Sequence, residues 1–159
     1  MAVTVPLAWA MGLVFTKGAI SDFPPILLMA FRFLLTALIL VAFTPLPRGN
    51  FFNLFLIAIV GAAIQYSLTF TGLLGLEAGI AAIIVQLEVP FLVMLGALLL
   101  GEKPGLRKWF GIGIAFCGII LMTWQGKFGA SLPSVGLVIG GAMAWAFGQV
   151  MVRRLQDIS

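Results

Sequence analysis

The chain has 159 residues, of which 62% are hydrophobic and 9% are charged, with a net charge of +4. An ordinary soluble domain is about 45–50% apolar and about 25% charged, so this composition predicts a membrane protein. The basic residues lie singly between apolar runs, which excludes a nucleic-acid-binding surface. With no histidine and one cysteine, Cys117, the sequence offers neither an ordinary Cys/His metal site nor a disulfide.

Six apolar runs approach the length of about 20 residues that a membrane helix needs. In chain order they cover about 2–20, 25–43, 54–74, 79–100, 109–124 and 136–152. Prolines open the second run, as suits a first helical turn, and Pro- and Gly-rich turns follow the second and fourth. We therefore predict an all-α, polytopic membrane helix bundle with about six transmembrane helices.

The positions of Lys and Arg predict the orientation in the membrane. If the N-terminus is cytoplasmic, the outer side holds only Lys127, with Lys17 near an outer helix end. The inner loops then hold six basic residues: Arg48, Lys103, Arg107, Lys108, Arg153 and Arg154. The positive-inside rule favours this arrangement. We expect an integral protein of the cell (inner) membrane with the N-terminus in the cytoplasm and the C-terminus, after the sixth span, also inside.

The end of the chain repeats its beginning. The segment Trp9-Ala-Met-Gly-Leu-Val-Phe-Thr-Lys17 returns as Trp145-Ala-Phe-Gly-Gln-Val-Met-Val-Arg153, with Trp, Ala, Gly and Val in register and a basic residue closing both copies. The repeat unit is five predicted spans long, so the second copy would enter the bilayer from the opposite side. Inverted repeats of this kind are the architecture of secondary transporters; chance similarity between apolar helices is the alternative.

Glu88 is the first candidate for a binding role because it lies about nine residues into the fourth span, about 13–14 Å deep. A carboxyl group at that depth is costly unless it is paired, protonated or hydrated, and a structural ion pair is the alternative to function. Pro90 removes a helical hydrogen bond, so we expect a kink and a free carbonyl at Gln86. Gln86 and Glu88 would face one cavity only if this kink bends the helix.

Arg32 lies about seven residues into the second span, roughly 10 Å below its outer end. Its guanidinium could bind a substrate carboxylate, pair with Glu88, or extend to the interface. In the third span, Gln65 and Thr69 are four residues apart and Tyr66 and Thr69 three apart, so we expect them to share a face. Hydrogen bonds between helices are the alternative for these polar groups.

Trp9 and Trp145 lie midway along their spans rather than at an interface, which indicates cavity lining or close helix packing. Small residues at Gly140-x-x-x-Ala-x-x-x-Gly148 and Gly111-x-x-x-Ala should let helix backbones approach closely. Cys117 reads as a small packing residue. The predicted binding residues are thus Glu88, Gln86, Arg32, Gln65, Tyr66 and Trp9, with Pro90 as the kink.

In these motifs the sequence resembles the EamA-type transporters of the drug/metabolite transporter superfamily. The resemblance covers nearly the whole chain and is carried by Trp9-x-x-Gly12 with Lys17, Pro24-Pro25 with Arg32, Gln86-x-Glu88-x-Pro90-Phe91, Leu100-Gly101-Glu102-Lys103, and Trp145-x-x-Gly148 with Arg153. It implies ten spans as two inverted five-helix repeats that export amino acids or other small metabolites. Residues 1–124 would form the first repeat, 125–135 a loop, and 136–159 the first helix of a truncated second repeat.

These features predict a secondary active exporter of small polar or zwitterionic metabolites, with Glu88 exchanging protons or binding the substrate amine and Arg32 binding its carboxylate. A proton-coupled carrier of the small-multidrug type acting as a homodimer is one alternative, although Arg32 would repel cations. A non-transporting fragment that lacks its C-terminal half is another. No nucleophile lies beside a base, so we expect neither an enzyme nor a bound cofactor or metal. The expected partners are a small-molecule substrate and the lipid bilayer.

Overall fold

A computed structural model describes residues 4–19, 23–43, 51–124 and 131–156 of the chain. All regular structure in these ranges is helical, which confirms the predicted all-α fold for them. The elements are α1 Thr4–Ala19, α2 Pro25–Phe43, α3 Phe51–Ala58, the π-helix η1 Ile59–Ile64, α4 Gln65–Leu74, α5 Ala78–Val85, α6 Glu88–Leu99, α7 Leu106–Trp124 and α8 Leu132–Gln156.

Four helical segments are long and apolar enough to cross a membrane: Pro25–Phe43, Phe51–Leu74, Ala78–Leu99 and Leu132–Leu155. These four confirm a polytopic membrane protein. The 16 residues of α1 and the 19 residues of α7 are not among them, so the full set of six spans stays a prediction.

The predicted loop over residues 125–135 is too long at its C-terminal end, because α8 already begins at Leu132. The main-chain N–H of Val135 donates to the Ser131 carbonyl at 3.0 Å, which closes the first turn of the helix. Pro133 lies in that turn, where its missing N–H costs no helical hydrogen bond.

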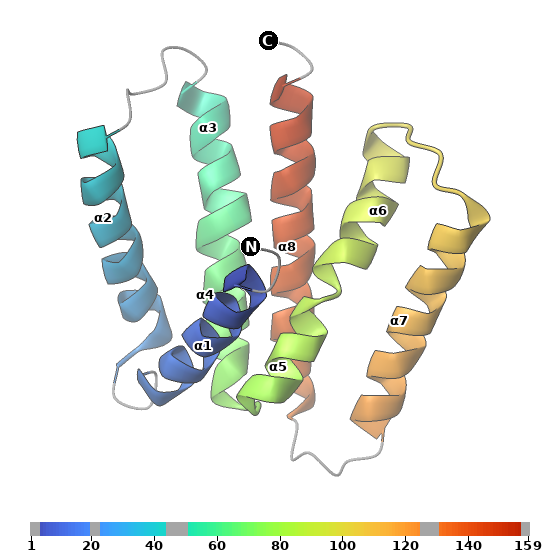
Figure 1. Cartoon of the computed structure of the whole chain (residues 1–159), viewed down its shortest axis with the longest axis horizontal. Helices are drawn as coiled ribbons and strands as arrows, with labels where there is room; N and C mark the ends of the chain where they lie inside the picture. Colours follow the sequence, from blue (N-terminus) through green and yellow to red (C-terminus); the bar gives the residue numbers. More distant parts are fainter. Residues whose placement is uncertain (1–3, 20–22, 44–50, 125–130, 157–159) are drawn as a thin grey trace.

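Helix α8 occupies the middle of the fold. Figure 1 shows it standing between the column formed by α3 and α4 and the column formed by α5 and α6, with α2 and α7 at the two sides. It contacts α4, η1, α5 and α6. The largest fully buried side chains come from α4, α5, α8 and the turn between α5 and α6: Leu73, Ile84, Leu87, Val138 and Val150. In the same view α1 descends from the N-terminus while α8 rises, so the two run in opposite directions.

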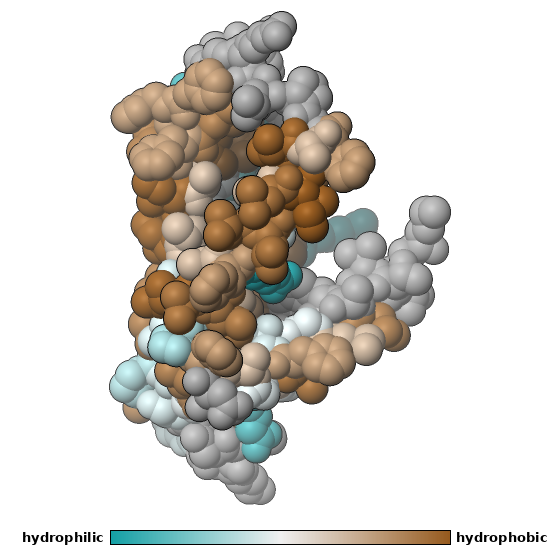
Figure 2. All heavy atoms as spheres, turned by 90° about the vertical axis from the view of Figure 1, so that its left-hand side faces the viewer, coloured by the Kyte–Doolittle hydropathy of each residue, from teal (hydrophilic) through white to brown (hydrophobic). Residues whose placement is uncertain are grey.

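Helices α2 and α7 expose most of their apolar side chains. Figure 2 shows the α2 side of the molecule, where hydrophobic residues cover a large continuous area. On α7, Phe110 and Leu121 are 74% and 62% exposed. A soluble monomer rarely exposes so large an apolar area, whereas hydrocarbon chains of a bilayer would cover it.

Glycine brings α8 very close to its neighbours. A Cβ at Gly148 would lie 2.6 Å from the Cα of Gly61 in η1, so these two helices meet backbone to backbone. A Cβ at Gly141 would overlap the hydroxyl of Thr69 in α4. The prediction of close packing through small residues is therefore confirmed for Gly148.

The same prediction is wrong for Gly111 of α7. A Cβ at Gly111 would meet nothing within 4 Å. Cys117, predicted as a packing residue, is exposed and lines an apolar groove of about 550 Å³ on α7 together with Trp109 and Leu121. Ala115, the second small residue of this motif, is half-buried and packs against the central apolar core, so only Gly111 and Cys117 fail the prediction.

Candidate functional site

The predicted fourth span is broken at the point where Gln86 and Glu88 lie. Helix α5 ends at Val85, residues 86 and 87 form a turn, and α6 begins at Glu88. The N–H groups of Gln86 and Leu87 donate to carbonyls three residues earlier, at 3.1 and 3.0 Å, which tightens the chain before the break. The predicted distortion near Pro90 is thus confirmed: the α-helical hydrogen bonding is interrupted at residues 86 and 87, although both keep right-handed helical dihedral angles.

The prediction that the Gln86 carbonyl lacks a hydrogen-bond partner is wrong. It accepts a hydrogen bond from the N–H of Val89 at 3.3 Å, and the Leu87 carbonyl accepts from Phe91 at 2.9 Å. Pro90 has no N–H, so it cannot donate the helical hydrogen bond to the Gln86 carbonyl. The tight turn instead brings the Val89 N–H to that oxygen. The groups at this break that could bind a substrate are therefore the side chains of Gln86 and Glu88, because the Gln86 carbonyl is already hydrogen-bonded.

Gln86 and Glu88 have different surroundings. Gln86 is exposed and lines a groove of about 220 Å³ between the break and α7, together with Pro90 and Gly118. Glu88 is half-buried, and it is not among the residues lining that groove. Within the described ranges, no ion pair involves Glu88. That these two side chains share one cavity stays a prediction.

Arg32 lies beside Tyr66 rather than in an ion pair with Glu88. Its guanidinium carbon is 5.9 Å from the centroid of the Tyr66 ring, within the range of a cation–π contact. The ring packs edge-on against Phe33 at 5.1 Å and stacks on Phe70 at 5.6 Å. These contacts place α2 against α4, and they place Arg32 and Tyr66 of the predicted site together.

Gln65 and Thr69 of α4 face α8. Both side chains are buried, at 5% and 4% exposure, and Gln65 Oε1 and Thr69 Oγ1 have no hydrogen-bond partner among the described protein atoms. That Tyr66 shares their face stays a prediction. The Tyr66 ring contacts Phe33 of α2, whereas the Thr69 hydroxyl and the Gln65 main-chain carbonyl lie against Gly141 of α8.

The two tryptophans of the repeat can be compared only in part. Trp145 is half-buried and packs against the central apolar core, which fits the packing alternative for it. Trp9 lies in α1, but its side chain is outside the described residues. The equal depth of the two side chains, and the place of Trp9 in a binding site, therefore stay predictions.

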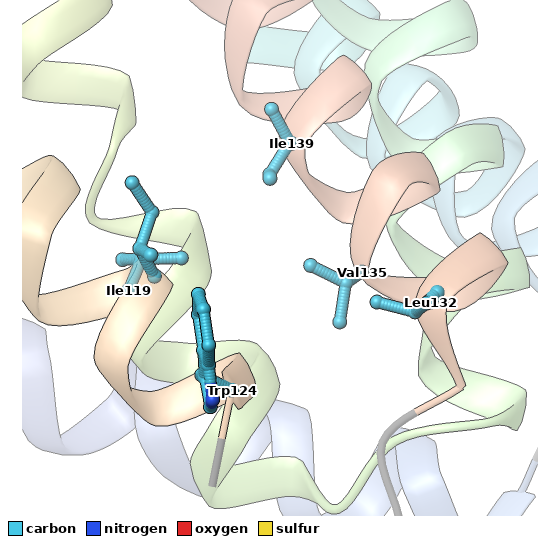
Figure 3. Close-up of a pocket in the computed structure, with 6 residues that line it drawn as sticks. Ile119, Trp124, Leu132, Val135 and Ile139 are labelled. Carbon is cyan, nitrogen blue, oxygen red and sulfur yellow. The ribbon is translucent and has the colours of Figure 1, made fainter. Parts of the chain in front are cut away.

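A groove of about 570 Å³ lies between α7 and the start of α8. Figure 3 shows the apolar side chains that face each other across it: Ile119, Trp124, Leu132, Val135 and Ile139. None of the six residues predicted to bind substrate lines this groove. Its lining offers almost no hydrogen-bonding groups, so it suits lipid chains better than a polar substrate.

Two basic side chains bind at the carboxyl ends of neighbouring helices, which the sequence reasoning did not foresee. The Lys17 ammonium donates to the carbonyls of Leu73 and Leu74 at 2.6 and 3.2 Å. At the opposite end, Arg153 forms an ion pair with Glu102 at 2.9 Å. The sequence signal for these contacts was the basic residue that closes each copy of the repeat.

The described residues hold no group of three or more side chains that could bind a metal ion.

The EamA-like transporter family matches residues 1–124, the range predicted for the first repeat. The chain is 25% identical over its whole length to an Escherichia coli protein named "Probable amino-acid metabolite efflux pump", of which it covers 54%. It is 27% identical over 94% of its length to the E. coli "Uncharacterized inner membrane transporter YedA", covering 51% of that protein.

A third relative, the Bacillus subtilis "Uncharacterized transporter YvbV", is 29% identical over 93% of the chain, which covers 51% of that protein. The chain thus spans about half the length of the curated relatives it matches. No solved structure matches it.

Proposed function

The chain belongs to the EamA-like transporter family, and we propose that it serves in secondary active export of small polar or zwitterionic metabolites, such as amino acids, across the inner membrane. The family consists of transporters and not of enzymes. Support for the substrate class comes from the relative named as a probable amino-acid metabolite efflux pump, and support for the membrane comes from the relative named as an inner membrane transporter.

The observation that carries the proposal is the interrupted helix at Gln86 and Leu87, with Glu88 opening its second half. Backbone that is not helical occurs at membrane depth only where protein buries it or where it lines a hydrated cavity. Secondary transporters place their substrate and ion sites at such discontinuous helices. An ionisable carboxyl group beside the interruption fits this pattern, because it could bind a proton or the ammonium group of a substrate.

Arg32 supplies the complementary charge in this proposal. Its guanidinium is held over the Tyr66 ring, and a guanidinium that stacks on an aromatic face keeps its N–H groups free for a carboxylate. A zwitterionic substrate would then bind through its amine near Glu88 and through its carboxylate near Arg32. The two groups form no ion pair with each other in the described part of the chain, so neither cancels the other.

The proposed transport unit contains a second set of helices, because the relatives are about twice as long as this chain. A longer chain or a second copy of this one would supply them. We place the N-terminus in the cytoplasm, on the side where Lys103, Arg107 and Lys108 lie.

Counterflow in proteoliposomes tests the proposal. The purified chain is reconstituted, loaded with a mixture of unlabelled neutral amino acids, and assayed for uptake of each labelled one with and without a pH gradient. We expect saturable uptake of at least one amino acid that the pH gradient changes. Uptake of a lipophilic cation such as tetraphenylphosphonium, without amino-acid uptake, would instead identify a carrier of the small-multidrug type. Folded protein that transports neither class would refute the proposal.

A further inference from the structure

Lys17, Glu102 and Arg153 belong to the motifs that relate this chain to its family, yet the proposed binding site uses none of them. Lys17 ends the first copy of the internal repeat and Arg153 ends the second, at the same position within each copy. Both side chains contact the carboxyl end of another helix. These residues therefore need a role other than substrate binding.

At the cytoplasmic end, α8 is joined to the end of α6 by two bonds. Arg153 Nη1 lies 2.9 Å from Glu102 Oε1, and Arg154 donates a hydrogen bond to the Leu99 carbonyl in the last turn of α6. That turn has carbonyls without helical partners and carries partial negative charge. Two adjacent arginines of α8 thus bind one helix end through a carboxylate and a main-chain oxygen.

Two glycines hold Glu102 in position for this contact. Gly101 has a φ of 69°, a left-handed conformation that glycine adopts without strain, and it turns the chain back after α6. The Glu102 N–H then donates to the Gly96 carbonyl at 3.2 Å. The carboxylate lies against Gly96, since a Cβ there would be 2.7 Å from Glu102 Oε2. Glu102 is therefore a positioned group rather than a freely moving surface acid.

At the other end of the bundle, Lys17 joins α1 to the end of α4. Its ammonium donates to the carbonyls of Leu73 and Leu74, at 2.6 and 3.2 Å. These oxygens belong to the last turn of α4, where a cation is favoured. The contact has the same chemistry as that of Arg154, with a basic residue of a repeat helix bound to the terminal carbonyls of its neighbour.

We propose that these contacts are two latches that open alternately in the transport cycle: an inner latch formed by Arg153 and Arg154 with the end of α6, and an outer latch formed by Lys17 with the end of α4. In one step α8 separates from α6 at the cytoplasmic end while α1 stays bound to α4 at the outer end. In the other step α8 is bound to α6 and α1 separates from α4. The proposal rests on the proposed function in assuming a transport cycle. Hydrated contacts suit this use, because Arg153 and Glu102 keep 45% and 47% of their side chains exposed and such pairs are weak enough to open. Both latches are closed in this structure, as in an occluded state.

Cysteine labelling tests the inner latch without any transport measurement. Val150 lies on α8 one turn before Arg153 and is 1% exposed. With Cys117→Ala as background, Val150→Cys should react slowly with a maleimide, and adding Glu102→Gln should raise the labelling rate severalfold. Glu77→Gln is the matched control, because Glu77 is exposed and its side chain makes no capping bond to α5; it should leave the rate unchanged.

The exchanged pair Glu102→Arg with Arg153→Glu should restore slow labelling, which a mere folding defect would not allow. Equal labelling rates in the Glu102→Gln and Glu77→Gln backgrounds would overturn the proposal.

A reversible cross-link tests whether the latch must open. Glu102→Cys and Arg153→Cys, again with Cys117→Ala, are joined by a bifunctional methanethiosulfonate reagent in reconstituted protein and released with a reductant. We expect the uptake that the double variant shows to stop on cross-linking and to return on reduction, whereas the reagent should not change the uptake of either single-cysteine variant. Normal uptake by the cross-linked protein overturns the latch. If the Cys117→Ala protein with Glu102 and Arg153 intact shows no uptake, the proposed function has failed, and the labelling rates still decide whether Glu102 holds α8 closed.

Discussion

Gly148→Ala should destabilise the bundle, because it adds a methyl group where two backbones touch. The new Cβ would lie 2.6 Å from Gly61 Cα and 3.1 Å from Gly61 N. Carbon atoms prefer about 3.5–4.0 Å, so α8 and η1 would have to separate by roughly 1 Å. The atoms that the new Cβ would meet are all main-chain atoms of Gly61, so no side chain can move aside to relieve the overlap. Overpacking of this kind costs about 1–3 kcal/mol, against a gain of about 0.5–1 kcal/mol from replacing glycine within a helix.

Gly136→Ala is the matched control, since it lies in the same helix and its Cβ would meet nothing within 4 Å. Both variants receive the same helix-propensity gain, so their free energies of unfolding should differ by about 1–3 kcal/mol. Gly61→Ala should cost less than Gly148→Ala, because its Cβ would lie at 3.4 Å from Gly148 Cα. Titration of micellar protein with dodecyl sulfate, followed by circular dichroism, measures all three. Equal stability of Gly148→Ala and Gly136→Ala would refute the backbone contact.

Three further outcomes are expected. Glu88→Gln should abolish the pH dependence of uptake while insertion and folding stay intact, because an amide cannot exchange a proton; unchanged pH dependence would make Glu88 a packing group. Single cysteines at Lys103 and Lys127 should be labelled from the inside and the outside respectively, and the reverse pattern would exclude the N-in orientation. Arg32→Gln should raise the half-saturation concentration for zwitterionic substrates at least several-fold, whereas Tyr66→Phe, which keeps the ring under the guanidinium, should change it little; equal effects would remove Arg32 from carboxylate binding.

Helix boundaries were predictable wherever proline or glycine sets them. The second run was expected over 25–43 and is observed as Pro25–Phe43, because Pro24-Pro25 start it and a Pro-rich segment follows it. The distortion before Pro90 was likewise foreseen from the missing N–H. These are local effects of the backbone, and they hold whatever surrounds the helix.

The rotation of each helix about its axis was not predictable in the same way. Lipid chains and a protein interior are both apolar, so an apolar span carries little signal for the face that meets another helix. Gly111 and Gly148 look alike in sequence, yet only Gly148 meets a neighbouring backbone. The π-helix Ile59–Ile64 also had no signal. It places Gly61 against α8, which is a tertiary contact between residues far apart in the chain.

The site was predicted as one cavity, and α8 explains why the structure divides its residues. Gln65 and Tyr66 lie on α4, Glu88 begins α6, and α8 stands between these two helices and contacts both. A cavity that joins Glu88 to the Arg32 and Tyr66 pair therefore requires α8 to shift. Since Arg153 and Arg154 hold the C-terminal end of α8 to α6, release of that end is the movement that would open the cavity. Binding at Glu88 and opening of the inner latch should accordingly be coupled, so that a bound substrate raises the labelling rate of Val150→Cys.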